Sequence, residues 1–102
     1  MTISVCAVTE LAPGDVRVVQ ADVAVAVFRT DDGALYAVDD TCTHQRASLA
    51  EGWVEGDTVE CPLHASCFDL RTGQPTGPPA TLPVRTHEVR VVDGHIWLEP
   101  AG

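Results

Sequence analysis

The chain has 102 residues, of which 45% are hydrophobic and 21% are charged. This composition is that of a globular protein rather than a disordered one, and two domains would each be too small to sustain a core. We therefore expect one domain over residues 1–102. The 15 acidic residues outnumber the 6 lysines and arginines, for a formal net charge of -9. That balance disfavours nucleic acids and anionic membranes as partners and favours a protein with a basic docking face.

The ends and the uncharged stretches of the chain predict a protein that stays where it is made. Residues 1–8 have neither the positive flank nor the apolar run of a signal peptide. The longest uncharged stretch, residues 72–84, is rich in proline and too short to span a bilayer. We therefore expect a cytoplasmic protein. In that reducing compartment the four cysteines should be free, metal-bound or catalytic rather than paired as disulfides.

Seven short segments are predicted to be strands, because most are rich in Val and Ile and they are bounded by Gly, Pro or Asp. They cover residues 3–8, 16–20, 23–29, 34–38, 57–60, 84–92 and 95–98. Asp93-Gly94 predicts a two-residue hairpin between the last two. Helical periodicity is not sustained anywhere, and residues 46–50 provide one short helical turn at most. The pattern predicts an all-β protein, either a sandwich or a barrel.

Two clusters of metal-ligating residues stand out: Cys42-Thr43-His44 and Cys61-Pro62-Leu63-His64. Each offers one thiolate and one imidazole within three or four positions, so a turn can direct both towards one site. Zinc fingers more often take two cysteines from one knuckle and two histidines from another element. One tetrahedral metal still accepts this set. A two-metal site, with both thiolates on one iron and both imidazoles on the other, explains the order more directly.

The spacing of these clusters resembles the signature of the Rieske family, C-x-H and then C-x-x-H after about sixteen residues. Glu51-Gly52, Gly56-Asp57 and the segment 68–73 are also similar to family sequence. The resemblance implies an antiparallel β-sandwich carrying a small subdomain, in which two loops around 42–48 and 61–68 bind one [2Fe-2S] cluster. It implies the following ligands: Cys42 and Cys61 on the inner iron, and His44 and His64 on the outer, more exposed iron.

The resemblance also implies a reduction potential near the low end of the family range, about -150 mV. High-potential relatives carry a disulfide between the two ligand loops, and Ala47 and Leu63 stand at the matching positions. Those relatives also place a Ser and a Tyr whose hydroxyls bond to the cluster. Ser66 matches the first, but Phe68 stands in place of the second and has no hydroxyl.

The function implied by the resemblance is that of a soluble Rieske-type ferredoxin, a one-electron carrier that performs no substrate chemistry. Its partners would be a flavin-dependent ferredoxin reductase and the terminal Rieske oxygenase of a bacterial aromatic-ring-hydroxylating dioxygenase, and the isolated chain would be monomeric. One alternative is the small Rieske subunit of an assimilatory nitrite reductase. Another is a zinc-stabilised interaction module with no redox role.

Other residues carry weaker expectations. Trp53 is expected to pack beneath the ligand loops, and Cys67 to be a small buried residue beside Phe68. Pairing through the Asp93-Gly94 turn places His87 and His95 on opposite faces, so they cannot share a metal. Five acidic residues near the ligands in sequence form either a docking rim or a solvated surface: Asp39, Asp40, Glu51, Glu55 and Asp57.

Overall fold

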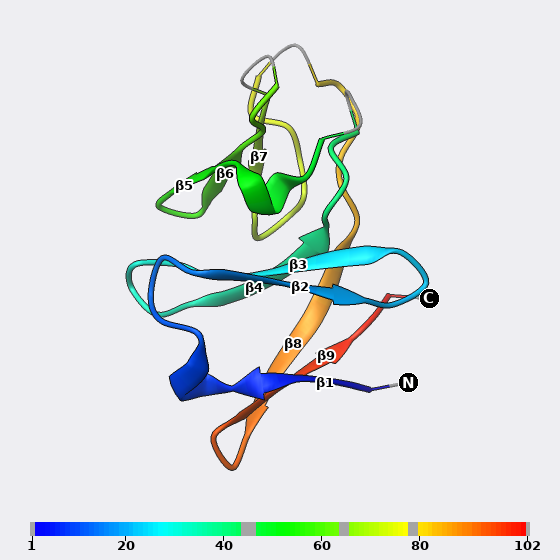
Figure 1. The fold of residues 1–102 in the computed structure, drawn as a ribbon. Coiled ribbons are helices and arrows are strands. Elements are labelled where there is room, and N and C mark those ends of the chain that lie inside the picture. Colours follow the sequence, from blue (N-terminus) through cyan, green and yellow to red (C-terminus); the bar gives the residue numbers. More distant parts are fainter. Residues whose placement is uncertain (1, 44–46, 64–65, 78–79, 102) are drawn as a thin grey trace.

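The computed structural model describes residues 2–43, 47–63, 66–77 and 80–101. These ranges form nine antiparallel strands and two short 3-10 helices, as Figure 1 shows. The strands are β1 (Ile3–Ala7), β2 (Val16–Gln20), β3 (Ala24–Arg29), β4 (Leu35–Asp39), β5 (Trp53–Glu55), β6 (Thr58–Glu60), β7 (Cys67–Asp69), β8 (Thr86–Val92) and β9 (His95–Glu99). The 3-10 helices are η1 (Val8–Glu10) and η2 (Leu49–Glu51). None of the described helices is both long and apolar enough to cross a membrane.

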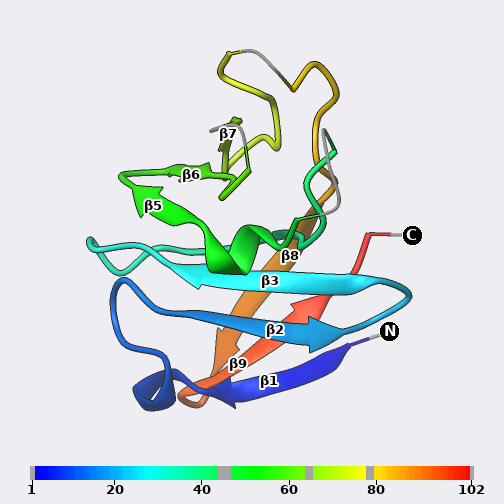
Figure 2. The ribbon, with the colours of Figure 1, turned by 45° about the horizontal axis from the view of Figure 1, so that its top comes forward.

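Six strands form a large sheet in the order β1-β9-β8-β4-β3-β2, and the other three form a small sheet in the order β5-β6-β7. The large sheet folds over, so that β8, β9 and β1 pass beneath β2, β3 and β4 (Figure 2). The small sheet stands above β3 and β4 in Figure 1. The all-β antiparallel architecture with a small added subdomain is therefore confirmed.

β3 is the structural centre because both of its faces are buried. Val25 and Val27 face a core that also contains residues of β1 and β9. Ala26 and Phe28 face a second core, made with the small sheet and the segments that follow β4 and β6. A strand buried on both faces requires an unbroken apolar run, which is what residues 24–28 provide. The second core fixes the small sheet on the large one.

The hairpin predicted at Asp93-Gly94 is confirmed, with Val92 opposite His95 and Val91 opposite Ile96. Both turn residues have positive φ, 51° and 76°, as a type I′ turn requires. Alternation along residues 84–92 also predicts Val91 on the core face, together with Val89, but Val91 is 48% exposed. β4 pairs only with Thr86 and His87 of β8, so the far half of this long strand, which includes Val91, extends beyond β4.

Two strands were missed, β5 and β7, and both have only three residues. Both exist because they pair with β6, which neither segment reveals by itself. The helical turn expected over residues 46–50 is instead the 3-10 helix η2, which begins at Leu49. Arg46 lies outside the described residues.

Candidate metal centre

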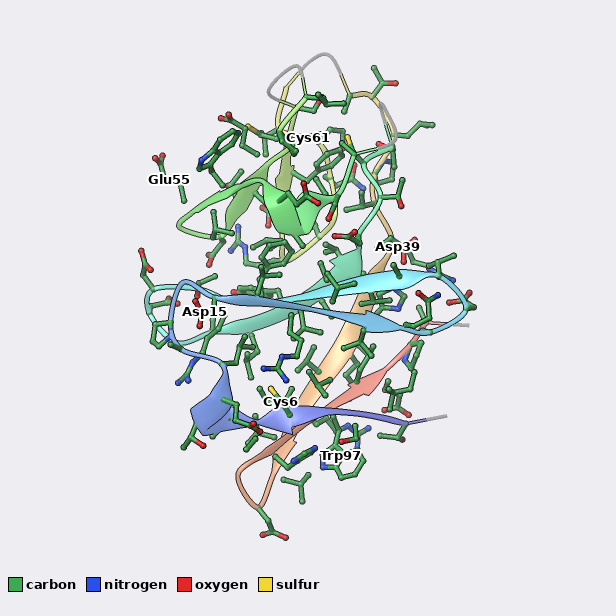
Figure 3. The ribbon with its side chains drawn as sticks, in the orientation of Figure 1. Cys6, Asp15, Asp39, Glu55, Cys61 and Trp97 are labelled. Carbon is green, nitrogen blue, oxygen red and sulfur yellow. The ribbon has the colours of Figure 1, made fainter. Side chains whose placement is uncertain are left out.

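Cys42 and Cys61, the two predicted thiolate ligands, lie together in the core between the small sheet and β3. Cys42 follows β4 and is 3% exposed, whereas Cys61 follows β6 directly and is fully buried. Burial raises the pKa of the Cys61 thiol, the Leu63 backbone lowers it, and a hydrogen bond with the Cys42 thiol raises it again. Figure 3 shows Cys61 in this upper part of the molecule, far from Cys6 in the lower layer. The structure therefore pairs two thiols from segments that are separate in sequence.

Asp40 closes the first ligand loop at its base. Its carboxylate accepts hydrogen bonds from the Ser48 hydroxyl and the Ala50 backbone N–H, both at 2.9 Å. Within the loop, the Cys42 N–H donates to the Ala47 carbonyl at 3.0 Å. These bonds hold the two ends of the loop together, so the Cys42 thiol is positioned by backbone and carboxylate rather than by packing alone.

The second ligand loop is closed by the Cys61 N–H, which donates to the Ser66 carbonyl at 2.6 Å. The Ser66 side chain is fully buried, and its hydroxyl has no hydrogen-bond partner within the described residues. Such an orphaned hydroxyl costs about 1–3 kcal/mol. A bound group with sulfur acceptors beside the two thiols would satisfy it. The donor set and this orphan together fit an iron–sulfur cluster.

The proline-containing segment after β7 packs against both ligand loops. The Thr43 hydroxyl donates to the Leu82 carbonyl at 2.7 Å, and Pro75 forms an isolated bridge with Phe68. Ala80 and Val84 belong to the same buried core as the two thiols. This segment therefore contributes directly to the walls of the centre.

The two predicted imidazole ligands, His44 and His64, lie outside the described residues, as do the neighbours Arg46 and Ala65 and the prolines at 78 and 79. Within the described ranges, no group of three or more metal-ligating side chains gathers. That result agrees with a centre to which the described part of the chain contributes two thiols.

Two expectations about residues near the ligands were wrong. Trp53 does not pack beneath the loops but is 61% exposed on the small sheet. Asp40 does not belong to an exposed rim, since it is buried at the base of the first loop. Asp39 is also engaged, through His87 at 2.7 Å and Arg85 at 3.4 Å. Of the five acidic candidates, Glu51 and Glu55 are exposed, and Asp57 lies 3.8 Å from Arg71.

Sequence reasoning missed the structural roles of Asp40 and of the pair formed by Asp39 and His87. The side chain of His87 is fully buried, and its Nδ1 accepts a hydrogen bond from the Ala101 N–H at 2.9 Å. His95 instead contacts Ser4, at 2.6 Å. The hairpin register places His87 and His95 on opposite faces, as predicted, and each has its own partners.

The remaining cysteines, Cys6 and Cys67, are not joined by a disulfide. Cys6 is buried in β1, and none of the four cysteines, all of which are described, forms a disulfide. Cys67 is only half-buried and faces outward from β7, next to the buried Phe68. The expectation of a buried Cys67 was therefore too strong, because the side chains of a strand alternate between faces.

Comparison with known proteins identifies the centre. The model of the Rieske [2Fe-2S] domain matches residues 1–88. The 3-phenylpropionate/cinnamic acid dioxygenase ferredoxin subunit of Photorhabdus laumondii is 47% identical over 95 residues, which are 92% of this chain and 90% of that protein.

Solved structures agree. In a complex of reduced oxygenase and oxidised ferredoxin of carbazole 1,9a-dioxygenase, one chain superposes with a TM-score of 0.90 and 40% identity, over 96% of this chain and 92% of that one. A candidate small subunit of NADH-dependent nitrite reductase from Mycobacterium tuberculosis is 27% identical, with a TM-score of 0.89 over 100% of this chain and 96% of that one.

These matches span nearly the whole chain and decide against the zinc-stabilised module. The cofactor is a Rieske-type [2Fe-2S] cluster, in keeping with the paired thiols and the orphaned Ser66 hydroxyl. The chain belongs to the Rieske [2Fe-2S] domain family.

Proposed function

We propose that this chain is the ferredoxin component of an aromatic-ring-hydroxylating dioxygenase system. It accepts one electron from a flavin-dependent ferredoxin reductase and delivers it to a terminal Rieske oxygenase. The observation that carries the proposal is the size and sequence of the chain. The chain is 47% identical to a dioxygenase ferredoxin subunit along 92% of its length, whereas its sequence identity to the candidate nitrite reductase small subunit is only 27%.

The ligands in this proposal are the predicted four: Cys42 and Cys61 on the inner iron, and His44 and His64 on the outer iron. When bound, the cluster supplies reversible one-electron chemistry. The residues of the chain provide the surroundings: two buried thiols that ionise on binding iron, a Ser66 hydroxyl free to donate, and an Asp40 carboxylate that holds the first loop. Replacing His64 with Cys tests the ligand set, because the added negative charge should lower the potential. An unchanged potential would exclude His64 as a ligand.

The proposed potential lies at the low end of the family range. Phe68 is fully buried, and its ring offers no hydroxyl to a neighbouring sulfur. No disulfide joins the two ligand loops, since none of the four cysteines, all of which are described, forms one. Dithionite should therefore reduce the purified protein, whereas ascorbate should not. Ready reduction by ascorbate would contradict the low potential.

Two exposed leucines next to the predicted ligands suit a transient contact with an electron-transfer partner. Leu63 directly precedes His64 and is 43% exposed, and Leu82, which is bonded to the first loop through Thr43, is 63% exposed. Small interfaces are typical of such encounters, because the carrier must leave after each transfer. These side chains would exclude water from the contact without forming a permanent complex.

The test of the proposed function is direct electron transfer. The holoprotein, reduced with dithionite and separated from excess reductant, is mixed in a stopped-flow instrument with the oxidised terminal oxygenase of carbazole 1,9a-dioxygenase. The ferredoxin of that system provides the positive control. We expect the cluster to be reoxidised by the oxygenase at a rate that increases with oxygenase concentration. Reoxidation by a nitrite reductase large subunit but not by the oxygenase would overturn the proposal.

A further inference from the structure

The outer face of the small sheet carries an aromatic and acidic hollow beside the second ligand loop. Side chains alternate across this sheet, so Val54, Val59 and Phe68 face the core. The cross-strand row Trp53–Glu60–Cys67 and the next row Glu55–Thr58–Asp69 face the other way. Most of these outward residues line a hollow of about 420 Å³: Trp53, Glu55, Thr58, Glu60 and Cys67, together with Val54 and Thr76.

Two carboxylates in this hollow, those of Glu55 and Glu60, form no salt bridge with the described residues. Asp69 on the same face is instead paired with Arg71 at 3.2 Å. Burial raises the pKa of the Cys67 thiol first, and the charges of Glu60 and Glu55 raise it further, so both carboxylates are close to this one thiol. Among the described residues these two carboxylates therefore have no cationic partner, although Glu60 Oε1 accepts a hydrogen bond from the Cys67 thiol, whose Sγ lies 4.0 Å away.

The indole of Trp53 completes a site of mixed character. It is 61% exposed, whereas tryptophan side chains are on average highly buried. The strand pairing places it directly opposite Glu60. A cation over an indole face is attracted by the ring, and a carboxylate beside it adds a salt bridge. Arginine and lysine side chains combine such a cation with an apolar stem that packs on aromatic surface. Figure 3 shows Glu55 projecting from this side of the subdomain, away from the large sheet.

The hollow adjoins the route by which an electron would leave. β6 ends at Glu60, immediately before Cys61, and β7 begins at Cys67, at the far end of the second loop. A partner that touches this loop therefore also reaches the hollow. We propose that the hollow receives an arginine or lysine side chain of the terminal oxygenase during docking. This inference rests on the proposed function and adds the residues that recognise the partner's charge.

The test compares two variants with equal loss of charge. Glu55→Gln with Glu60→Gln removes both charges of the hollow. Glu88→Gln with Asp93→Asn removes two charges from the β8–β9 hairpin, which lies at the opposite end of the molecule from the small sheet (Figure 1). The rate of electron transfer to the carbazole dioxygenase oxygenase is measured at low and high salt. An exposed ion pair changes affinity by about 1.4- to 5-fold.

We expect the hollow variant to be about 3- to 10-fold slower at low salt, with a weaker salt dependence, and Trp53→Ala to be about 2- to 5-fold slower. The hairpin variant should stay within 2-fold of the original protein. Equal effects in both double variants would show that the rate depends only on the net charge of the protein, and this result would overturn the inference. No effect in either variant would also overturn it. Unchanged reduction potentials in all variants show that docking, not the cluster, has been altered.

A second readout separates this inference from the proposed function. A hexa-arginine peptide is titrated into each holoprotein by calorimetry. Peptide affinity should fall further in the hollow variant than in the hairpin variant, because only the hollow combines two carboxylates with an indole. If the original protein reduces no oxygenase but this difference remains, the proposed function fails and a cation site stands. If the difference is absent, the inference fails whatever the oxygenase does.

Discussion

Replacing Ser66 with alanine tests whether the orphaned hydroxyl serves the cluster. In the described structure this side chain is fully buried and its Oγ has no partner. A hydroxyl that donates to a sulfur of the cluster stabilises the reduced form, which carries one more negative charge. Its loss should therefore lower the reduction potential.

The magnitude follows from the energy of a hydrogen bond to a charged group, about 1.5–3 kcal/mol. If the bond belongs entirely to the reduced form, one electron converts this energy to a shift of roughly 60–130 mV, at about 59 mV per 1.4 kcal/mol. A smaller difference between the redox states gives a proportionally smaller fall. The fall adds to the effect of Phe68, which already lacks a hydroxyl.

The assay is voltammetry of the holoprotein, with Thr58→Ala as the control. Thr58 is on the same subdomain, but its side chain is on the outer face of β6, opposite in direction to the buried Val59. The control should leave the potential within about 15 mV, which corresponds to less than 0.4 kcal/mol. If Ser66→Ala leaves the potential unchanged while the cluster content is normal, the hydroxyl does not donate to the cluster, and the argument from the orphaned group is wrong.

Three further predictions concern how the centre is held. Asp40→Ala should lower the free energy of unfolding by about 2–4 kcal/mol and reduce cluster content, because two hydrogen bonds to a buried carboxylate are lost; thermal denaturation measures this, and Asp40→Asn should recover part of it. Gly52→Ala should destabilise the small sheet, since the added Cβ would lie 1.9 Å from a β6 carbonyl oxygen, whereas Gly77→Ala meets nothing within 4 Å and should be neutral. A Gly52→Ala protein as stable as its control would contradict the close approach. Hydrogen bonding to Arg71 holds the pKa of Asp69 below its usual 3.8, so its contribution is complete above that value and is lost as pH falls towards the lowered pKa. The free energies of unfolding of Asp69→Asn and of the original protein should therefore converge in acid. A difference between them that stays constant from pH 7 to pH 2 would refute the contribution of the bond between Asp69 and Arg71.

The sequence was most informative where one residue type at one spacing carries the chemistry. Cys42 and Cys61 were chosen as ligands from their neighbours and spacing alone, and the structure brings both thiols into one buried site. The Asp93-Gly94 hairpin could also be predicted from the sequence, because the positive φ values of its turn suit only a few residue types. In both cases the information is local.

The sequence was least informative where the environment of a side chain depends on strand pairing. Trp53 was expected beneath the ligand loops because it stands between them in the sequence, yet it lies outside because Val54, its neighbour in β5, takes the inward position. Asp40 was expected in a docking rim or on a solvated surface because it is an acidic residue close to the ligands in sequence, yet it binds Ser48 in a buried position. Recognising β5 as a strand would have shown the first error, since alternation fixes both faces at once.

From its residues alone, this chain predicts an all-β fold, a mixed thiolate and imidazole ligand set, and a surface that is strongly acidic overall. These properties follow from residue type and from short-range alternation. Only the tertiary structure decides which acidic residues accept several internal hydrogen bonds, as Asp40 does, and which form no salt bridge with the described residues, as Glu55 and Glu60 do. The physical reason is that a carboxylate has no preferred partner of its own. Its role is set by the donors that chain folding brings to it from distant segments.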